Sequence, residues 1–475
     1  MLRIASLLPF LILPASVAAA ANKATETVSS LEDQTSVAVT IYNQDLALVR
    51  DSRSIAVASG EQTLAFREVS AMIRPETALL ASPGLQVLEQ NFEYDLLTPE
   101  SLLNKYVGRT VNLVKTHPTT GEETTAEATV LSAGNGTVLK VGEHIESGVP
   151  GRLIFPDVPE NLRDRPTLTM LVNSKDGGKQ DAVLSYLTGG LSWKADYVAE
   201  LGSDNASINL SGWVTLKNES GATYQNAKLQ LVAGEVNRAK EPMPAMRMMR
   251  MAAAPAEAAL ASDMAEESMF EYHLYTLGRP TTIKEKQSKQ VSLLQADGVK
   301  VKKEFVLQGE NYYYGNAAGN LGQKLKVGVF LELKNAKEAG AGQPLPAGIM
   351  RVYKKDSSGS LQFVGEDRID HTPENETIRL KLGDAFDVTA NKKQTDFKKA
   401  PWTSGTAYES AYQIELKNAK EEAVSVKVVE PVPGDWEMVE ESLPHKKESS
   451  GTAVWEVQIE PKNSSTLTWR VRVKN

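Results

Sequence analysis

Histidine is the side chain here that could serve as a general base or a metal ligand. The five histidines are His117, His144, His273, His371 and His445. None lies four residues from another, the spacing that puts two imidazoles on one face of a helix-borne zinc site. The chain has no cysteine, which excludes disulfides, thiolate nucleophiles and cysteine-ligated metal centres.

Sequence motifs of common enzyme classes are also missing. We find no G-x-S-x-G elbow, no phosphate-binding G-x-x-x-x-G-K-[ST] loop and no G-x-G-x-x-G after a strand. We therefore expect a protein that is not an enzyme, and we assign no catalytic, cofactor-binding or metal-binding residue.

An acidic cluster surrounds His371. It comprises Glu366, Asp367, Asp370, Glu374 and Glu376. Carboxylates near an imidazole raise its pKa, and clustered oxygens can hold Ca²⁺. Because the EF-hand spacing is absent, we interpret residues 370–375 as a polar turn between a strand ending near Ile369 and one beginning at Thr377. A cation site is the alternative.

A methionine-rich run offers a second metal hypothesis. Met246, Met248, Met249 and Met251 are thioethers, which select Cu(I). Arg247 and Arg250 place cations beside these sulfur atoms. We favour an adaptable linker that contacts a partner or its own domain, with copper binding as the alternative.

Tryptophan side chains can stack on sugar rings or fill a core. We expect four of the six to lie in sandwich cores: Trp193, Trp213, Trp455 and Trp469. The other two, Trp402 and Trp436, sit among prolines and glycines and are our candidates for exposed sugar contacts.

The elements that must position these side chains are strands. Apolar residues alternate with polar ones through Val37-x-Val39-x-Ile41, through 208–216 and through Val424-x-Val426-x-Val428. Helical periodicity is confined to a short piece after Thr98 and an alanine-rich stretch near Ala256. We predict a mainly β fold, with several immunoglobulin-like sandwich units, a small SH3/Sm-like barrel and few helices.

Length and composition suggest several domains, since 475 residues exceed what one core usually serves. We predict a signal peptide over 1–20, an N-terminal β domain over 21–97, the small barrel over 98–160 and a β-sandwich over 161–240. A flexible Met/Ala/Pro-rich linker follows over 241–268. A β domain over 269–400 and a C-terminal immunoglobulin-like sandwich over 401–475, with Trp455 or Trp469 in its core, complete the chain.

A repeated phrase links the later units. Leu-Lys-Asn closes an alternating strand at Asn218, Asn335 and Asn418. Asparagine makes Asx turns and tolerates left-handed backbone, so it suits the exit from a strand into a hairpin loop. We expect similar local architecture at the three positions.

The N-terminal residues indicate export. Arg3 precedes an apolar stretch over 4–13 that is too short to span a bilayer, and alanines at 18–20 offer a cleavage site. No later window is long and apolar enough for a transmembrane helix. The net charge of −8 has the wrong sign for a nucleic-acid partner. We expect a periplasmic or extracellular protein without a transmembrane segment.

Four segments carry a family resemblance: 184–197 (LSYLTGGLSWKADY), 365–373 (GEDRIDHTP), 382–388 (LGDAFDV) and 429–436 (VEPVPGDW). They resemble a bacterial exported family of unknown function, whose defining domain also forms the C-terminal part of mucoidy-inhibitor-like proteins. The resemblance extends from about residue 36 to the end. It implies no catalytic residue, and it implies an association with exopolysaccharide that some relatives carry.

These observations favour an uncharacterised exported envelope protein with a non-catalytic binding or assembly role. Its partner would be an envelope protein or a polysaccharide. The alternatives are a carbohydrate-binding or carbohydrate-modifying envelope protein and a periplasmic metal-binding protein.

Overall fold

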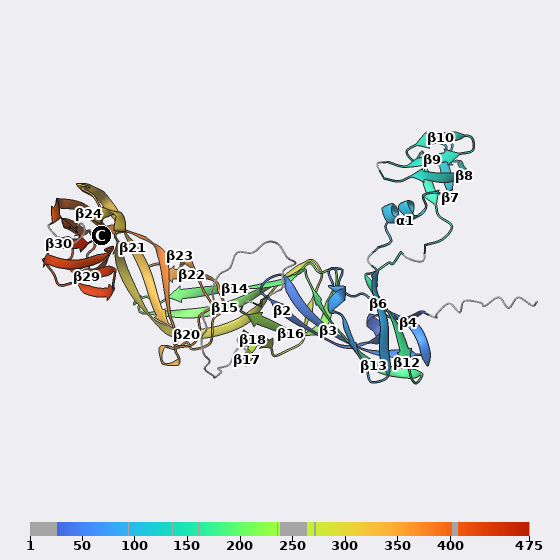
Figure 1. The fold of residues 1–475 in the computed structure, drawn as a ribbon, viewed down its shortest axis with the longest axis horizontal. Coiled ribbons are helices and arrows are strands. Elements are labelled where there is room, and N and C mark those ends of the chain that lie inside the picture. Colours follow the sequence, from blue (N-terminus) through green and yellow to red (C-terminus); the bar gives the residue numbers. More distant parts are fainter. Residues whose placement is uncertain are drawn as a thin grey trace, which may run out of the picture. The chain divides into compact units, whose positions relative to one another are not determined.

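The computed structural model describes residues 26–93, 95–134, 136–159, 162–234, 236–237, 264–269, 272–400 and 407–474. These residues form a mainly β structure (Figure 1), which confirms the predicted fold class. The one α-helix among them, α1 (Pro99–Lys105), begins after Thr98, whose hydroxyl accepts a hydrogen bond from the Ser101 N–H. The predicted signal peptide, Ala256 and Trp402 lie outside the described residues.

The chain divides into two compact units. The first unit holds Met1–Ser36 and Arg50–Tyr186, and the second holds Val37–Val49 and Leu187–Asn475. Strands β2 (Gln34–Tyr42) and β3 (Leu46–Val57) contribute residues to both units. Four short 3₁₀ helices are described: Leu31–Asp33, Pro75–Thr77, Asn311–Tyr314 and Lys337–Ala339.

A four-stranded sheet forms much of the first unit. Its order is β1 (Glu26–Ser29), β4 (Gly60–Arg67), β12 (Thr167–Ser174) and β6 (Leu85–Glu93). Leu64, Phe66 and Leu168 are fully buried on its inner face. Nearby in this unit, β5 (Leu79–Ala81) pairs with β13 (Gly178–Thr188).

The predicted small barrel is an open sheet instead. Its strand order is β10 (His144–Ser147), β9 (Val138–Val141), β8 (Glu123–Ser132), β7 (Thr110–Thr116) and β11 (Arg152–Ile154). The edge strands β10 and β11, only four and three residues long, do not pair with each other among the described residues. Leu102 and Leu103 of α1 pack against the core instead of a closing strand.

In the second unit, β16 (Tyr224–Ala233) runs parallel to β2 and antiparallel to β18 (Tyr272–Leu277) and β19 (Thr281–Ile283). Strand β17 (Met264–Met269) pairs with β18. The predicted linker over 241–268 is therefore wrong at its end, because residues 264–268 lie in a strand. Cross-strand pairing with β18 outweighs their weak local pattern. The rest of that prediction falls outside the described residues.

A large sheet spans the predicted domains 161–240 and 269–400. Strand β14 (Leu191–Leu201) pairs antiparallel with β15 (Ser207–Asn218) and parallel with β22 (Gly348–Lys355). Strand β23 (Leu361–Ile369) forms the sheet edge beyond β22. The two predicted domains thus share one sheet. Parallel partners are joined by long connections, so local periodicity does not reveal such pairs.

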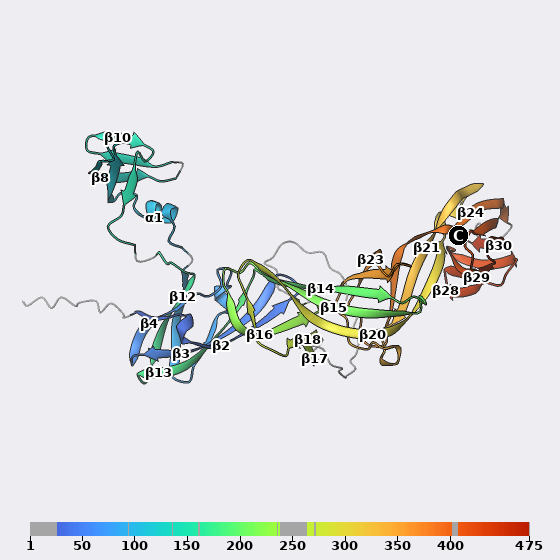
Figure 2. The ribbon, with the colours of Figure 1, turned by 180° about the vertical axis from the view of Figure 1, so that it is seen from behind.

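The sheet continues into a C-terminal sandwich through β20 (Gln287–Gln308), which pairs with β15 along its first part and with β21 (Asn320–Lys334) beyond it (Figure 2). One layer continues from β21 through β24 (Thr377–Ala400), β25 (Ala407–Asn418), β30 (Ser464–Lys474) and β27 (Asp435–Glu441). The other holds β26 (Val424–Pro431), β29 (Thr452–Ile459) and β28 (Lys446–Ser449). Because Phe305, Val327 and Val388 belong to its core, a boundary at residue 401 divides this core.

The three asparagines of the Leu-Lys-Asn repeat have one structural role. Asn218, Asn335 and Asn418 are buried at strand ends. The Asn418 amide donates to the carbonyls of Glu422, Ile459 and Glu460, and its oxygen accepts from the Lys420 N–H. The Asn218 amide likewise donates to Ala222 and Ile283, and the Asn335 amide to Gln343, Thr372 and Pro373. The predicted Asx turn is confirmed at Asn218 and Asn418, where the oxygen accepts from the N–H two residues on.

Candidate functional site

The residues singled out around His371 have separate partners. The Nδ1 atom of His371 lies 3.2 Å from the Ala347 backbone nitrogen, which donates to it. Glu366 pairs with Arg351, and Glu374 pairs with Lys337. Within the described part of the chain, no group of three or more histidine, aspartate and glutamate side chains is placed to hold a metal ion. The local hydrogen bonds fit the polar-turn interpretation.

Two tryptophan predictions are wrong. Trp213 is 37% exposed, whereas Trp436 is only 7% exposed and donates its indole N–H to the Ser450 carbonyl at 2.8 Å. Position explains both: Trp213 lies on the face of β15 opposite Leu210 and Val214, and Trp436 begins β27 facing the sandwich core. Trp193, Trp455 and Trp469 are buried, as predicted.

The most unusual chemical feature is a buried ion pair inside the C-terminal sandwich. The Lys392 Nζ lies 2.6 Å from each carboxylate oxygen of Glu430. The two side chains are 2% and 0% exposed. Both occupy core positions of alternating strands: Lys392 follows Val388 and Ala390 on β24, and Glu430 follows Val426 and Val428 on β26.

Aromatic rings enclose this pair. The Lys392 Nζ lies 4.1 Å from the centre of the Tyr313 ring and 5.4 Å from that of Trp469. The Tyr314 hydroxyl donates to the Glu430 Oε2 at 2.9 Å. Ring faces attract an ammonium group, and this attraction strengthens where water is excluded. The third proton of the ammonium thus faces a ring while the other two face oxygen.

Burial decides the direction of the pKa shifts. It raises the pKa of the Glu430 carboxyl and lowers the pKa of the Lys392 ammonium, against the mutual attraction of the two charges. Burial also raises the pKa of Tyr314 well above its usual value, so this hydroxyl keeps its proton and remains a donor. Compared with water, burial therefore disfavours the charged forms of both members of the pair.

Two further residues shape the space around the pair. A Cβ at Gly309 would collide with the Glu430 carboxylate, so this position requires glycine. On the lysine side, Gln394 is two residues further along β24 and also faces the core. Its amide donates to the Tyr313 carbonyl at 3.2 Å. Gly309 thus leaves room for the Glu430 carboxylate, and Gln394 binds the backbone of Tyr313, whose ring lies over Lys392.

Strands β21, β24 and β25 also line a polar pocket of about 400 Å³, and Lys392 and Gln394 belong to its lining. Residues 391 and 393 alternate with the buried residues 392 and 394. Irregular pairing of β21 around Gly322 opens the sheet beside them. The pocket is lined mainly by amide and charged side chains, including Asn320, Gln323, Asn391, Lys393, Gln413 and Glu415.

A second surface feature is apolar. Strand β23 ends the sheet, and Leu361, Phe363 and Val364 on it are 50%, 57% and 40% exposed. Phe386 of β24 is 93% exposed. Strand β23 contacts β24 where the Lys381 N–H donates to Asp367 and where Gly365 lies against Leu382. We call Leu361, Phe363, Val364 and Phe386 the apolar tip.

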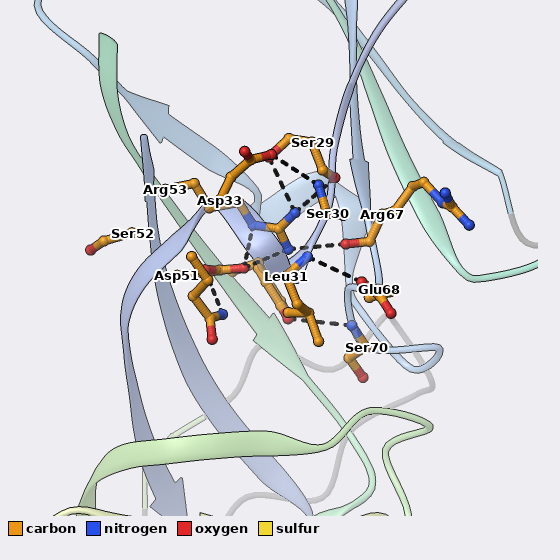
Figure 3. A network of polar contacts seen from close by, with 12 residues as sticks. Ser29, Ser30, Leu31, Asp33, Asp51, Ser52, Arg53, Arg67, Glu68 and Ser70 are labelled. Carbon is orange, nitrogen blue, oxygen red and sulfur yellow. Dashed lines mark hydrogen bonds and ion pairs between the residues drawn. The ribbon is translucent and has the colours of Figure 1, made fainter. Parts of the chain in front are cut away.

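The first unit holds another buried charged cluster, drawn in Figure 3. The Arg53 guanidinium donates to the Asp51 Oδ2 at 2.8 Å, the Ser29 carbonyl at 2.9 Å and the Arg67 carbonyl at 3.0 Å. It thereby connects β3 to β1 and β4. All of these hydrogen bonds lie within the first unit, so the role of the cluster is structural: it holds three strands together.

A family comparison matches residues 182–475, more than half of the chain, to Domain of unknown function (DUF4139). The chain belongs to the DUF4139 family. No curated protein matches it. The DUF4139 segment contains the buried pair, the polar pocket and the apolar tip, whereas Arg53 precedes it. Among the described residues, no helix is long and apolar enough to cross a membrane.

Sequence reasoning missed the buried pair, although a signal exists. In the alternating pattern, Lys392 occupies the next core-facing position after Val388 and Ala390. Glu430 does the same after Val426 and Val428. A charged residue at a core position predicts a buried partner. Which partner it meets depends on the tertiary fold, because β20 and β21 separate β24 from β26 in the strand order.

Proposed function

We propose that this DUF4139 protein is an exported component of the bacterial cell envelope that acts by binding, without catalysis. The signal-peptide pattern over 1–20 supports export to the periplasm. The four segments that resemble mucoidy-inhibitor-like proteins support an envelope role. The partner is an envelope protein, bound at the apolar tip.

Exposure of Phe386 carries this proposal. A phenylalanine that is 93% exposed leaves nearly its whole side chain in water, and three apolar residues of the neighbouring strand β23 are exposed as well. Clustered exposed apolar side chains are typical of interaction sites. Burying them in a complex would remove this apolar surface from water.

The edge strand favours an extended segment as the bound form. Residues Leu361, Gln362 and Phe363 pair with β22 on one side only, since β23 ends the sheet. Protected edges usually carry lysine, proline, a bulge or a short strand. Leu361–Val364 contains neither lysine nor proline, and its protection is limited to a bulge at Val364. A partner segment that adds to this edge would gain backbone hydrogen bonds and cover the apolar side chains.

Site-specific photo-crosslinking in the envelope tests this proposal. A photoreactive residue at Phe386 or Phe363 should yield one discrete adduct with an envelope protein. Val439 is the control, since it is 44% exposed on β27, the opposite edge of the same sheet. Adducts of equal yield from all three positions, or none from the two phenylalanines, would contradict the proposal.

A polysaccharide is the second candidate partner, because the polar pocket offers several amide and charged groups. Hydroxyl groups of a glycan exchange hydrogen bonds well with such side chains. Envelope polysaccharide should retard the protein in affinity electrophoresis, and replacing Gln413 and Lys393 by alanine should abolish the retardation. Lys326→Ala, at an exposed lysine outside the pocket lining, is the control. Equal mobility with and without polysaccharide would exclude this candidate.

A further inference from the structure

The lysine and glutamate of the buried pair are already in reacting distance. The Lys392 Nζ contacts both Glu430 oxygens at 2.6 Å, so it lies next to the carboxyl carbon that joins them. Both side chains are buried side by side, so neither has to move in from the surface to meet the other. Holding the two groups together makes their condensation a reaction within one molecule instead of a bimolecular one.

The surroundings disfavour the charged state of the pair. Removing a carboxylate and an ammonium from water costs several kcal/mol per ion, and only part is recovered by their attraction. In water, solvation stabilises an amine and a carboxylic acid as ammonium and carboxylate ions, and these ions do not condense. That solvation is absent here, and burial shifts both pKa values toward the neutral forms. A neutral product would relieve the desolvation cost.

We propose that Lys392 and Glu430 condense after folding into an intramolecular amide bond. A proton passes from the ammonium to the Oε1 of Glu430, which leaves a neutral amine and a carboxylic acid. The amine lone pair attacks the carboxyl carbon, and the C–N bond forms. Oε1 then leaves with a second amine proton as one molecule of water. No oxidant, reductant or other reactant is needed.

The neighbouring residues give each oxygen a different role. The Tyr314 hydroxyl donates to Oε2 at 2.9 Å, so Oε2 is the oxygen that becomes the amide carbonyl. Among the described side chains, only Lys392 donates a hydrogen bond to Oε1. Oε1 is therefore the oxygen that leaves. The Lys392 Nζ lies equally far from both oxygens, so the attack requires the carboxyl group to rotate until the amine stands above its plane. Tyr314 is a positioning residue, because it acts by holding Oε2.

Such a bond would join β24 to β26, two strands that do not pair with each other and that β20 and β21 separate in the strand order. This inference does not depend on the proposed partner, and it concerns how the DUF4139 domain withstands unfolding. A covalent connection between residues 392 and 430 closes a loop in the unfolded chain and lowers its conformational entropy, as a disulfide does. The chain has no cysteine with which to make a disulfide.

Mass spectrometry of the full chain tests the proposal directly. We expect the folded protein to be lighter than its sequence by one water molecule. A tryptic digest should contain one branched peptide, in which residues 382–393 are joined to residues 428–446. Fragmentation should place the junction at Lys392 and Glu430. Protein kept in denaturant from synthesis onward should have the full mass and lose water on refolding.

Two controls separate this bond from other losses of water. Cyclisation at Asp176-Gly177 or Asp297-Gly298 also removes one water, but it would persist in Lys392→Met and would give no branched peptide. Tyr314→Phe removes the donor to Oε2, so it should slow water loss during refolding while leaving the same final mass. A folded wild-type protein at full sequence mass, with separate peptides 382–392 and 428–446, would overturn the proposal.

Discussion

Glycine at position 309 leaves the space that the Glu430 carboxylate occupies. The carboxylate cannot move away easily, because Lys392 and Tyr314 hold it in a buried place. A methyl group at this position forces a rearrangement of the core, and such overpacking usually costs about 1 to 3 kcal/mol. Gly309→Ala should lower the free energy of unfolding by this amount in urea titrations.

The matched control is Gly315→Ala, a few residues further along the chain. A Cβ at Gly315 meets no heavy atom within 4 Å. The backbone φ of Gly315 is −95°, which alanine adopts freely. Equal effects of the two substitutions would show that the Glu430 carboxylate does not fill the space beside Gly309.

Glu409 should make the sandwich sensitive to acid. Its side chain is 8% exposed and lies about 3 Å from the charged ends of Lys398, Arg470 and Arg472. The hydrogen bond from Lys398, with those from Arg472 and Arg470, holds the pKa of the Glu409 carboxyl below its usual value, against the effect of burial. This stabilisation is complete above the pKa of the unfolded chain, about 4.3, and disappears as the pH falls through the lower folded value.

Glu409→Gln should therefore be less stable than the wild type at pH 7, and the difference should shrink as the pH falls below about 4. Thermal melts across this range measure the effect. Glu421→Gln is the control, because the Glu421 side chain is 87% exposed and its pairing with Lys462 contributes little. A constant difference between Glu409→Gln and wild type at every pH would contradict the assignment.

At the scale of elements, the repeated asparagines fix how strands end. The Asn418 amide donates to three carbonyls from two neighbouring segments. Asn418→Ala would leave those carbonyls and the Lys420 N–H without this partner. Each buried group left unsatisfied costs about 1 to 3 kcal/mol, so we expect a loss of at least that size in denaturant unfolding. Asn463→Ala, at an exposed position, should cost far less.

Periodicity predicts the strands well but their partners poorly. The alternation over 208–216 gives β15, and the same parity places Trp213 on the opposite face from Leu210, where it is exposed. Residue type predicts Trp213 in the core, whereas its position in the alternation correctly predicts the exposed face. The charged side chains of Lys392 and Glu430 stand at core positions that the sequence also reveals.

The sequence does not reveal which strands pair when they lie far apart along the chain. Val198 of β14 lies opposite Arg351 of β22, and no local pattern specifies that register. The same holds for the parallel pairing of Phe305 on β20 with Val426 on β26, which closes the sandwich. The buried pair depends on this closure. The sequence therefore shows that Lys392 and Glu430 are charged residues at core positions. That they meet follows only from the assembled sandwich.

For the molecule as a whole, the main difference from the predicted domains is where the C-terminal sandwich begins. Trp455 and Trp469 fill its core, as expected for residues 401–475. Yet Phe305, Leu307 and Val327 belong to the same core and come from β20 and β21. Lys392 also lies before residue 401. The sandwich is thus one end of a larger sheet, and its last strands complete a core that earlier strands begin.

This arrangement predicts how fragments behave. A fragment of residues 396–475 keeps both tryptophans but loses β20, β21 and most of β24, so Glu430 has no lysine partner and one side of the core faces water. It should show a disordered circular dichroism spectrum and no cooperative melt. The fragment 182–475 keeps every strand from β14 onward and should melt cooperatively. Its melting temperature should lie below that of the whole chain, because the fully buried Val39 and Ile41 of β2 are missing beside β16. A cooperative β-type melt of 396–475 alone would show that its strands fold independently of β20, β21 and β24.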